Sequence, residues 1–230
     1  GTRIYFTMGN TQTYNAGHFV FENAKLNSTP YPGKATATIV VKNCNSAQSA
    51  FKGCNFIVES GTNGFVIDVE AFTGNVVNCS YMFQNATTND YFMTINIGPV
   101  GNGNYMFDHF TFDSGTATYH KRITVSWIDF STATTLKYAF ANCNAEEIQG
   151  IENSDFSNCT DFENMFVNTN NLGDTTLNGL LKALTTASSY TGTKTLAQLG
   201  FNATAYPASR ISALSNYNTL FIPAGWAIGY

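Results

Sequence analysis

A short phrase with a central phenylalanine recurs six times along the 230-residue chain. In five of the six copies an Asn or Gly stands two positions after the Phe. The six central residues are Phe21, Phe51, Phe83, Phe107, Phe140 and Phe166. They lie 30, 32, 24, 33 and 26 residues apart, which is the length of one repeated supersecondary unit. Because one such unit cannot bury its own apolar face, the repeat predicts a solenoid with a continuous core.

Each unit also carries a run of branched and aromatic residues before the Phe. Such runs occupy 38–41, 65–69, 92–97 and 123–128, and they predict strands. The apolar residues that follow lie three or four positions apart, which predicts one or two helical turns around the Phe. The Asn or Gly after the Phe suits the left-handed conformation that ends such a turn. The sequence therefore predicts an α/β repeat.

Two stretches of the chain, 127–143 and 155–166, resemble the BspA-like leucine-rich repeats of bacterial surface proteins and phage structural proteins. In that family a strand end of the Asp-Leu-Ser kind is followed by a Met-Phe-x-x-Cys helix. Here Asp155-Phe156-Ser157 precedes Met165-Phe166. The match is good over 125–170 and looser over 14–124, where Phe, Ile and Val replace Leu. The resemblance implies a right-handed leucine-rich-repeat-like solenoid that serves as a surface recognition scaffold.

The last sixty residues depart from the repeat. Residues 177–184 have the apolar spacing of a helix, and 209–214 predict another that starts after Pro207. Solenoids need atypical end units to cover their last layer. We therefore expect an irregular BspA-like solenoid of about six repeats in residues 1–170 and a helical C-terminal cap in residues 171–230.

Composition narrows the classes of partner. Charged residues make up 11% of the chain, against about 25% in ordinary domains. The net charge of −4 and the lack of a basic run argue against nucleic acid. No apolar run approaches the ~18 residues that span a bilayer, so we expect no membrane insertion. The aromatic share of 14% and the many Asn, Thr, Ser and Gly residues favour an extracellular place, on a virion or a bacterial cell surface.

The cysteines are odd in number, and each follows an Asn or Gly at a repeat-related position: Cys44, Cys54, Cys79, Cys143 and Cys159. Equivalent positions of stacked units face the core, so we interpret them as buried free thiols, with a single disulfide as the alternative. The spacing offers no zinc motif, and no cofactor is expected.

Signals for catalysis are thin. The candidate acid–base residues are Asp108 with His109, Asp113 with His120, and the group Asp155, Asp161 and Glu163. The two pairs are interpreted as solvated loop pairs. The three carboxylates have the composition to flank a glycosidic bond. Their place near a predicted helix start explains them without catalysis, because carboxylates complement the helix dipole there. We expect no enzyme activity.

The connections between each Phe phrase and the next strand vary in length, and such insertions project on one face of a solenoid. They are rich in Tyr, Ser, Gly and Asn, the residues of adaptable recognition loops. The candidate ligand-binding residues are Tyr31, Asn63, Asn89, Tyr91, Tyr119, His120 and Trp127. The rings are expected to stack on a sugar face while the amides bind its hydroxyls. The alternatives are ordinary turn chemistry and, for Trp127, burial in the core.

These features together predict a non-enzymatic adhesion or receptor-binding domain that recognises a host or cell-surface glycan or protein. The alternative is a structural or assembly protein of a phage virion, which forms a homo-oligomer or attaches to a larger virion or surface assembly. A glycan-cleaving enzyme is the third hypothesis.

Overall fold

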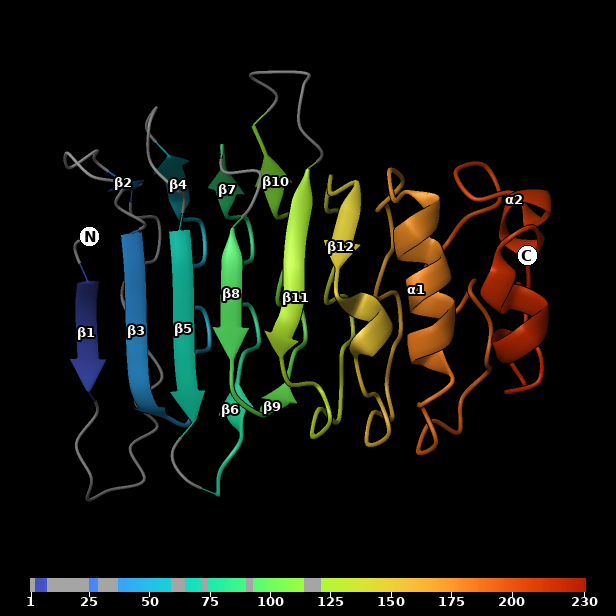
Figure 1. The fold of residues 1–230 in the computed structure, drawn as a ribbon, viewed down its shortest axis with the longest axis horizontal. Helices are drawn as coiled ribbons and strands as arrows, with labels where there is room; N and C mark the ends of the chain where they lie inside the picture. Colours follow the sequence, from blue (N-terminus) through green and yellow to red (C-terminus); the bar gives the residue numbers. More distant parts are fainter. Residues whose placement is uncertain are drawn as a thin grey trace.

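The computed structural model describes residues 3–7, 25–28, 37–58, 65–71, 74–89, 93–113 and 121–230. These residues form a parallel β-solenoid whose coils lie side by side in chain order (Figure 1). One strand from each of six coils builds a parallel sheet of order β1-β3-β5-β8-β11-β12, called the front sheet below. Its strands are β1 (Arg3–Thr7), β3 (Ala37–Cys44), β5 (Phe65–Ala71), β8 (Thr94–Ile97), β11 (Arg122–Ile128) and β12 (Glu147–Gln149).

Two smaller parallel sheets close the coils. The second sheet has the order β10-β7-β4-β2, and the third pairs β6 with β9. Their strands are β2 (Lys25–Ser28), β4 (Asn55–Val58), β6 (Val77–Asn78), β7 (Thr87–Thr88), β9 (Val100–Asn102) and β10 (Thr111–Phe112). The coils that begin with β5 and β8 run from the front sheet through the third sheet to the Phe phrase, and then through the second sheet to the next front strand.

The front strands form where the sequence predicts them, because branched and aromatic side chains alternate with polar ones there. In β5, Phe65, Ile67 and Val69 are buried, while Asp68 is half-buried and Glu70 is exposed. Successive side chains of a strand point to opposite faces, so this pattern turns one face to the core and the other outward. The outward face of the front sheet is therefore the broad surface that the solenoid presents.

The central Phe residues form the predicted ladder through the core. Phe51, Phe83, Phe107, Phe140 and Phe166 are each at most 1% exposed. Consecutive rings stack with centroids 5.2–5.4 Å apart and planes within 12° of parallel. The prediction of a single buried ladder is confirmed for these five; Phe21 lies outside the described residues.

The Phe phrases are turns, so the prediction of helical turns there is wrong. Residues two before and two after each of the five described central Phe residues take the left-handed conformation, with φ between 55° and 66°. Alternate N–H groups point to the next coil: Phe83 N–H donates to the Met106 carbonyl at 2.8 Å, and Phe107 N–H to the Ala139 carbonyl at 2.7 Å. A helix would direct these donors along its own chain. The left-handed role of the Asn or Gly is confirmed at Gly53, Asn85 and other copies.

Helical segments take over in the C-terminal part of the chain (Figure 1). η1 (Ile151–Asn153) directly follows β12, and the later coils, whose residues are all described, contain no front strand but α1 (Asp174–Leu184), α2 (Ala208–Ser212) and η2 (Tyr217–Phe221). The predicted helix at 177–184 and the start of another after Pro207 are confirmed. Hydrogen bonds between neighbouring coils continue in this part of the chain, since Phe166 N–H donates to the Leu199 carbonyl at 2.8 Å. Within the described ranges every helix is too short or too polar to cross a bilayer.

Buried aromatic residues fill the end of the core. The Trp226 ring is 2% exposed and stacks on Tyr190 and Phe221 with centroids 5.7 and 5.8 Å away. Its indole Nε1 donates to the Leu184 carbonyl at 3.1 Å. This hydrogen bond lets the large ring be buried without loss of its donor.

All five cysteines are buried and none forms a disulfide, as the interpretation of structural thiols predicts. Burial raises the pKa of the Cys44 thiol to about 11, and those of Cys143 and Cys159 to about 12. Burial also raises the pKa of Cys79, and the nearby Cys44 adds to the effect. These four thiols therefore stay protonated and unreactive in the folded chain.

Truncation of one ladder ring tests the shared core. We expect Phe83→Ala to lower the free energy of unfolding by about 3–5 kcal/mol, because it removes a fully buried ring and leaves a cavity. Urea denaturation measures the change. Tyr217→Ala is the control, because the Tyr217 side chain is only partly buried. A loss no larger for Phe83→Ala than for Tyr217→Ala would contradict the ladder.

Alkaline pH tests the buried thiols. The ordinary thiol pKa is 9.0, and burial raises that of Cys143 to about 12. Above pH 9 the unfolded chain releases this proton and the folded chain keeps it, so stability is lost as pH rises from about 9 to 12. We expect each such thiol to contribute up to about 1.4 kcal/mol per pH unit in that window. Urea midpoints at pH 7.5 and 10.5 measure it, and Cys143→Ala should show a smaller pH dependence than the parent chain.

Candidate functional site

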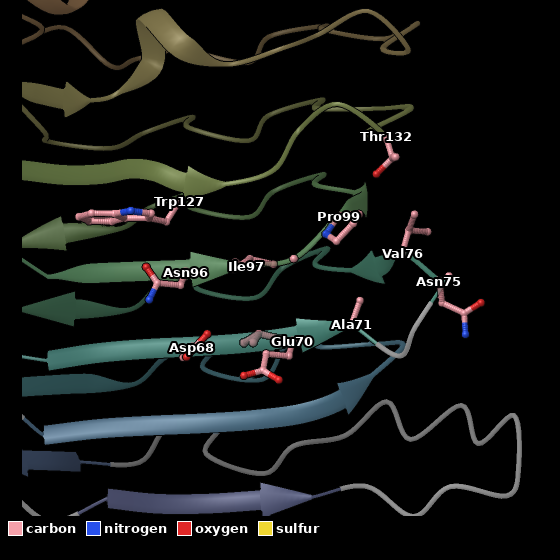
Figure 2. A pocket seen from close by; sticks show the side chains of 13 residues that line it. Asp68, Glu70, Ala71, Asn75, Val76, Asn96, Ile97, Pro99, Trp127 and Thr132 are labelled. Atoms are coloured by element: carbon pink, nitrogen blue, oxygen red, sulfur yellow. The ribbon is translucent and has the colours of Figure 1, made fainter.

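The parallel register aligns outward side chains of the front sheet in rows across the coils. Asp68 of β5 pairs with Asn96 of β8, and Asn96 pairs with Trp127 of β11. Neighbouring strands lie about 4.8 Å apart, so the three residues form a short row across the strands. Figure 2 shows this row on three adjacent strands, in the middle of β5 and near the carboxyl ends of β8 and β11.

A register shift in β11 turns Trp127 outward. The pairing of β11 with β8 slips between Thr124 and Trp127, and both Ser126 and Trp127 are exposed. With strict alternation after the buried Val125, Trp127 would face the core and Ile128 would face solvent. The extra residue reverses this arrangement: Trp127 is 59% exposed and Ile128 is 6% exposed. Burial of Trp127 in the core, the alternative that the sequence left open, is therefore wrong.

Gly150 makes room for the irregular segment of β11. It takes φ +90°, a conformation that favours glycine, and a Cβ placed on it would lie 2.1 Å from Ser126 Oγ and 2.7 Å from Ser126 Cα. The next coil thus contributes to the position of Trp127 through a residue that lacks a side chain.

An open groove of about 590 Å³ lies beside Trp127. The front sheet supplies Asp68, Glu70 and Asn96, and the turns at the strand ends supply Val76 and Pro99 (Figure 2). Its described lining contains two carboxylates and no Lys, Arg or His. The groove combines an aromatic and aliphatic surface with amide, hydroxyl and carboxylate groups, which is typical of a small-molecule site.

The side-chain oxygen of Asn96 lacks a hydrogen-bond partner among the described residues. This Oδ1 atom is buried, and no donor reaches it within that part of the chain. A buried acceptor without a donor costs about 1–3 kcal/mol. An incoming O–H or N–H group would satisfy it.

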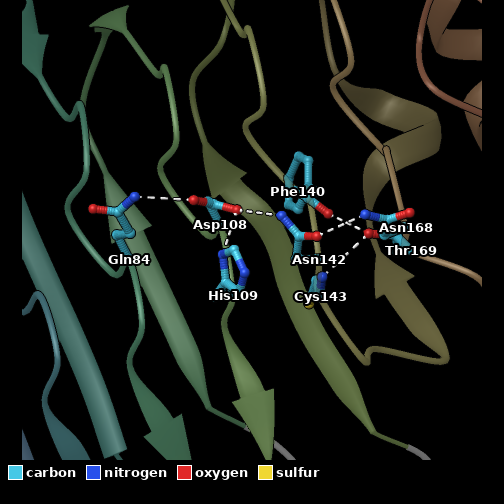
Figure 3. Close-up of polar contacts among 8 residues, drawn as sticks. All are labelled: Gln84, Asp108, His109, Phe140, Asn142, Cys143, Asn168 and Thr169. Carbon is cyan, nitrogen blue, oxygen red and sulfur yellow. Dashed lines mark hydrogen bonds and ion pairs between the residues drawn. The ribbon is translucent and has the colours of Figure 1, made fainter.

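A second polar cluster belongs to the Phe phrases (Figure 3). The Asp108 carboxylate is buried and accepts from Gln84 Nε2 and Asn142 Nδ2, both at 2.9 Å. It also contacts His109 Nδ1 at 2.8 Å, and Asn168 Nδ2 donates to Asn142 Oδ1 at 3.0 Å. The pair predicted from the sequence exists, but Asp108 is not solvated as expected. It joins neighbouring coils in a polar ladder, while the His109 side chain is 56% exposed.

The other candidate acid–base groups stay apart from the groove. Asp155 Oδ1 accepts from Ser157 N–H, and Asp161 Oδ1 from Glu163 N–H, each at 2.9 Å. These contacts are Asx turns rather than the helix start that the sequence indicated. His120 lies outside the described residues, so its pairing with Asp113 is not placed. Among the described residues, no three His, Cys, Asp or Glu side chains gather as a metal site.

A ladder of tyrosines is a feature that sequence reasoning missed. Tyr81, Tyr105 and Tyr138 each lie two residues before a central Phe, and their rings stack with centroids 5.0 and 4.9 Å apart. Lys52 lies over the Tyr81 ring at 5.8 Å, and Lys137 over the Tyr138 ring at 5.7 Å. The repeated Tyr at one position of three consecutive phrases was the signal. Because the ring faces cover one another, this ladder offers mainly ring edges to a ligand.

Only two of the seven predicted ligand-binding residues are described. Trp127 lines the groove, whereas Asn89 follows β7 in the second sheet and its N–H donates to the Phe56 carbonyl at 3.3 Å. The structure therefore does not group these two. The remaining five lie outside the described residues: Tyr31, Asn63, Tyr91, Tyr119 and His120.

Comparison with known proteins gives one family match. Residues 134–191 are similar to a family described as a Mycoplasma protein of unknown function, DUF285. The matched segment contains two Phe phrases, β12 and α1. No curated protein and no solved structure matches the chain.

Substitution of Gly150 tests how Trp127 is positioned. We expect Gly150→Ala to lower the free energy of unfolding by about 2 kcal/mol or more, through a strained φ and the clash with Ser126. Gly225→Ala is the matched control, because Gly225 has φ +83° and open space where its Cβ would stand. Chemical denaturation compares the two variants. Equal losses would show that backbone strain alone matters and that Ser126 does not require the space.

Proposed function

We propose that this chain is a non-enzymatic recognition module, an adhesion or receptor-binding domain that binds a host or cell-surface glycan or protein. The observation that carries the proposal is Trp127, which is 59% exposed on an interior strand of a parallel sheet and is held outward by a register shift. Parallel sheets ordinarily have both faces covered. An aromatic side chain kept in solvent on such a face is the kind of residue that dominates binding energy at interfaces.

The surrounding chemistry favours binding over catalysis. Trp127 lies beside a groove with amide and hydroxyl groups, and such a surface recognises partners by stacking and neutral hydrogen bonds. Asp68 and Glu70 stand two residues apart on one strand, so they approach a bound ligand from the same side. Glycoside hydrolysis needs carboxyl groups that flank the bond, which this arrangement does not provide.

The finer features of the fold belong to the same proposal. We infer that the coils are right-handed BspA-like leucine-rich repeats in residues 1–170 and that residues 171–230 form a cap. The helices in the front position of the last coils and the buried Trp226 cluster support a cap. The low charge and the resemblance of 155–166 to the repeats of surface proteins support a place on a bacterial cell or virion.

A structural protein of a phage virion is the second candidate. It is favoured by exposed apolar side chains in and beside η2 of the last coils, where Leu220 is 38% and Ile222 is 41% exposed. A surface of this kind at the end of a solenoid suits stacking against another subunit or module. Such a protein would assemble into a fixed oligomer without host material.

Binding of the isolated chain to whole bacterial and host cells tests the two candidates. A recognition module should bind at least one cell type as a monomer, and Trp127→Ala should weaken this binding at least about fivefold. Leu220→Ala is the control, because it removes another exposed apolar side chain far along the solenoid. Size-exclusion chromatography is run in parallel. Robust self-assembly without binding to any cell would reject recognition and favour the structural protein.

Salt provides an independent test of the type of contact. If stacking and neutral hydrogen bonds dominate, binding to cells should change less than about threefold between 50 mM and 500 mM NaCl, because salt screens exposed charges. Flow cytometry of the labelled chain measures this dependence. A loss of more than tenfold would indicate that charged groups carry the interaction.

A further inference from the structure

The groove beside Trp127 has the two-sided chemistry of a carbohydrate site. Its apolar part consists of the Trp127 ring, Pro99 and Val76, which is itself 43% exposed. Its polar part contains Asn96 and Thr132. A pyranose ring likewise has a face of C–H groups and a rim of hydroxyls. An aromatic ring favours the C–H face, and amide groups favour the rim.

The unpartnered Asn96 Oδ1 indicates which group the ligand must bring. This atom is buried and accepts no hydrogen bond from the described residues, so a ligand that displaces the side chains covering it gains by donating to it. Trp127 occupies the paired position on the neighbouring strand. A ring stacked on Trp127 would therefore carry its rim about one strand spacing away, over Asn96.

The place of the groove on the front sheet argues against a bound peptide strand. β8, the strand at the centre of the groove, pairs with β5 on one side and β11 on the other, so its backbone N–H and C=O groups are used within the sheet. A peptide strand gains most of its affinity from such groups at a free edge. A ligand in this groove must be recognised through side chains.

The charged side chains of the groove narrow the class of ligand further. The described lining holds Asp68 and Glu70 but no basic side chain that would pair with an acidic sugar. The volume of about 590 Å³ lies within the ~300–1,000 Å³ range of small-ligand sites, and the groove is open. The row from Asp68 through Asn96 to Trp127 runs across the strands, so a ligand longer than one ring would follow the solenoid axis.

We propose that this groove binds a neutral saccharide, with one ring stacked on Trp127 and one hydroxyl donating to Asn96 Oδ1. The proposal rests on the recognition function above and names its ligand class. No bond in the saccharide is broken.

Titration of the full chain with neutral and acidic oligosaccharides tests the proposal. The probes are lactose, mannotriose, cellotriose and diacetylchitobiose, with sialyllactose and trigalacturonate as acidic counterparts, and isothermal calorimetry reports binding. We expect at least one neutral probe to bind and the acidic probes to bind at least about tenfold more weakly. Binding confined to acidic probes would overturn the proposal.

Variants locate the site. Trp127→Ala should weaken binding of the neutral probe at least about tenfold, and Trp127→Phe should retain part of it. Asn96→Leu should weaken binding about fivefold or more, whereas Asn96→Asp, which keeps an acceptor, should retain more of it. Leu220→Ala should bind as the parent chain does, and thermal melting confirms that each variant is folded. Unchanged binding in folded Trp127→Ala would overturn the proposal.

Cells separate failure of this proposal from failure of the recognition function. Periodate oxidation destroys the vicinal diols of surface saccharides and leaves the polypeptide chains of surface proteins in place. Loss of cell binding after this treatment supports a saccharide ligand. Equal binding to treated and untreated cells, with no probe bound, would overturn the saccharide proposal and leave the recognition function standing. Failure to bind any cell or probe would reject both.

Discussion

Hydrogen bonding from each coil to the next is the constraint on which this solenoid depends. Alternate N–H groups of a Phe phrase donate to carbonyl groups of the following phrase, as from Phe83 to Met106 at 2.8 Å. This ladder sets a strand-like spacing, and the central rings stack at a matching 5.2–5.4 Å. Units of 24 to 33 residues can share one core because the differences in length are confined to the connections.

The same constraint decides what the outward face presents. Register passes from coil to coil, so side chains at equal positions of the front strands form rows, as Asp68, Asn96 and Trp127 do. A single irregularity in β11 exchanges the inward and outward residues beyond it. Because the Phe ladder lies inside and the rows lie outside, the outer residues can differ between coils at little cost to the core.

The sequence predicts the solenoid, its front strands and the Phe ladder, because these depend on local patterns that repeat. The turns around each Phe were predicted as helical because apolar residues three or four apart fit a short turn as well as a helix. The sequence left both exposure and burial of Trp127 open, since the outcome depends on a shift at Ser126 and on the space at Gly150 in the next coil. The burial of Asp108 is equally non-local, because Gln84 and Asn142 lie 24 and 34 residues away in sequence.

Two polar side chains, Asp108 and Asn96, differ in how completely the protein itself satisfies their hydrogen-bond acceptors. Asp108 lies between coils that offer donors from both sides, and its carboxylate is fully used within the protein. Asn96 also lies between two coils, but its neighbours in the row are a carboxylate and an indole ring that is turned outward. Neighbouring coils thus supply hydrogen-bond donors to the Asp108 carboxylate but none to Asn96 Oδ1 among the described residues. A solenoid of repeated coils gains a specific site where one row departs from the repeat, and here that departure leaves an acceptor and an aromatic face together beside a groove.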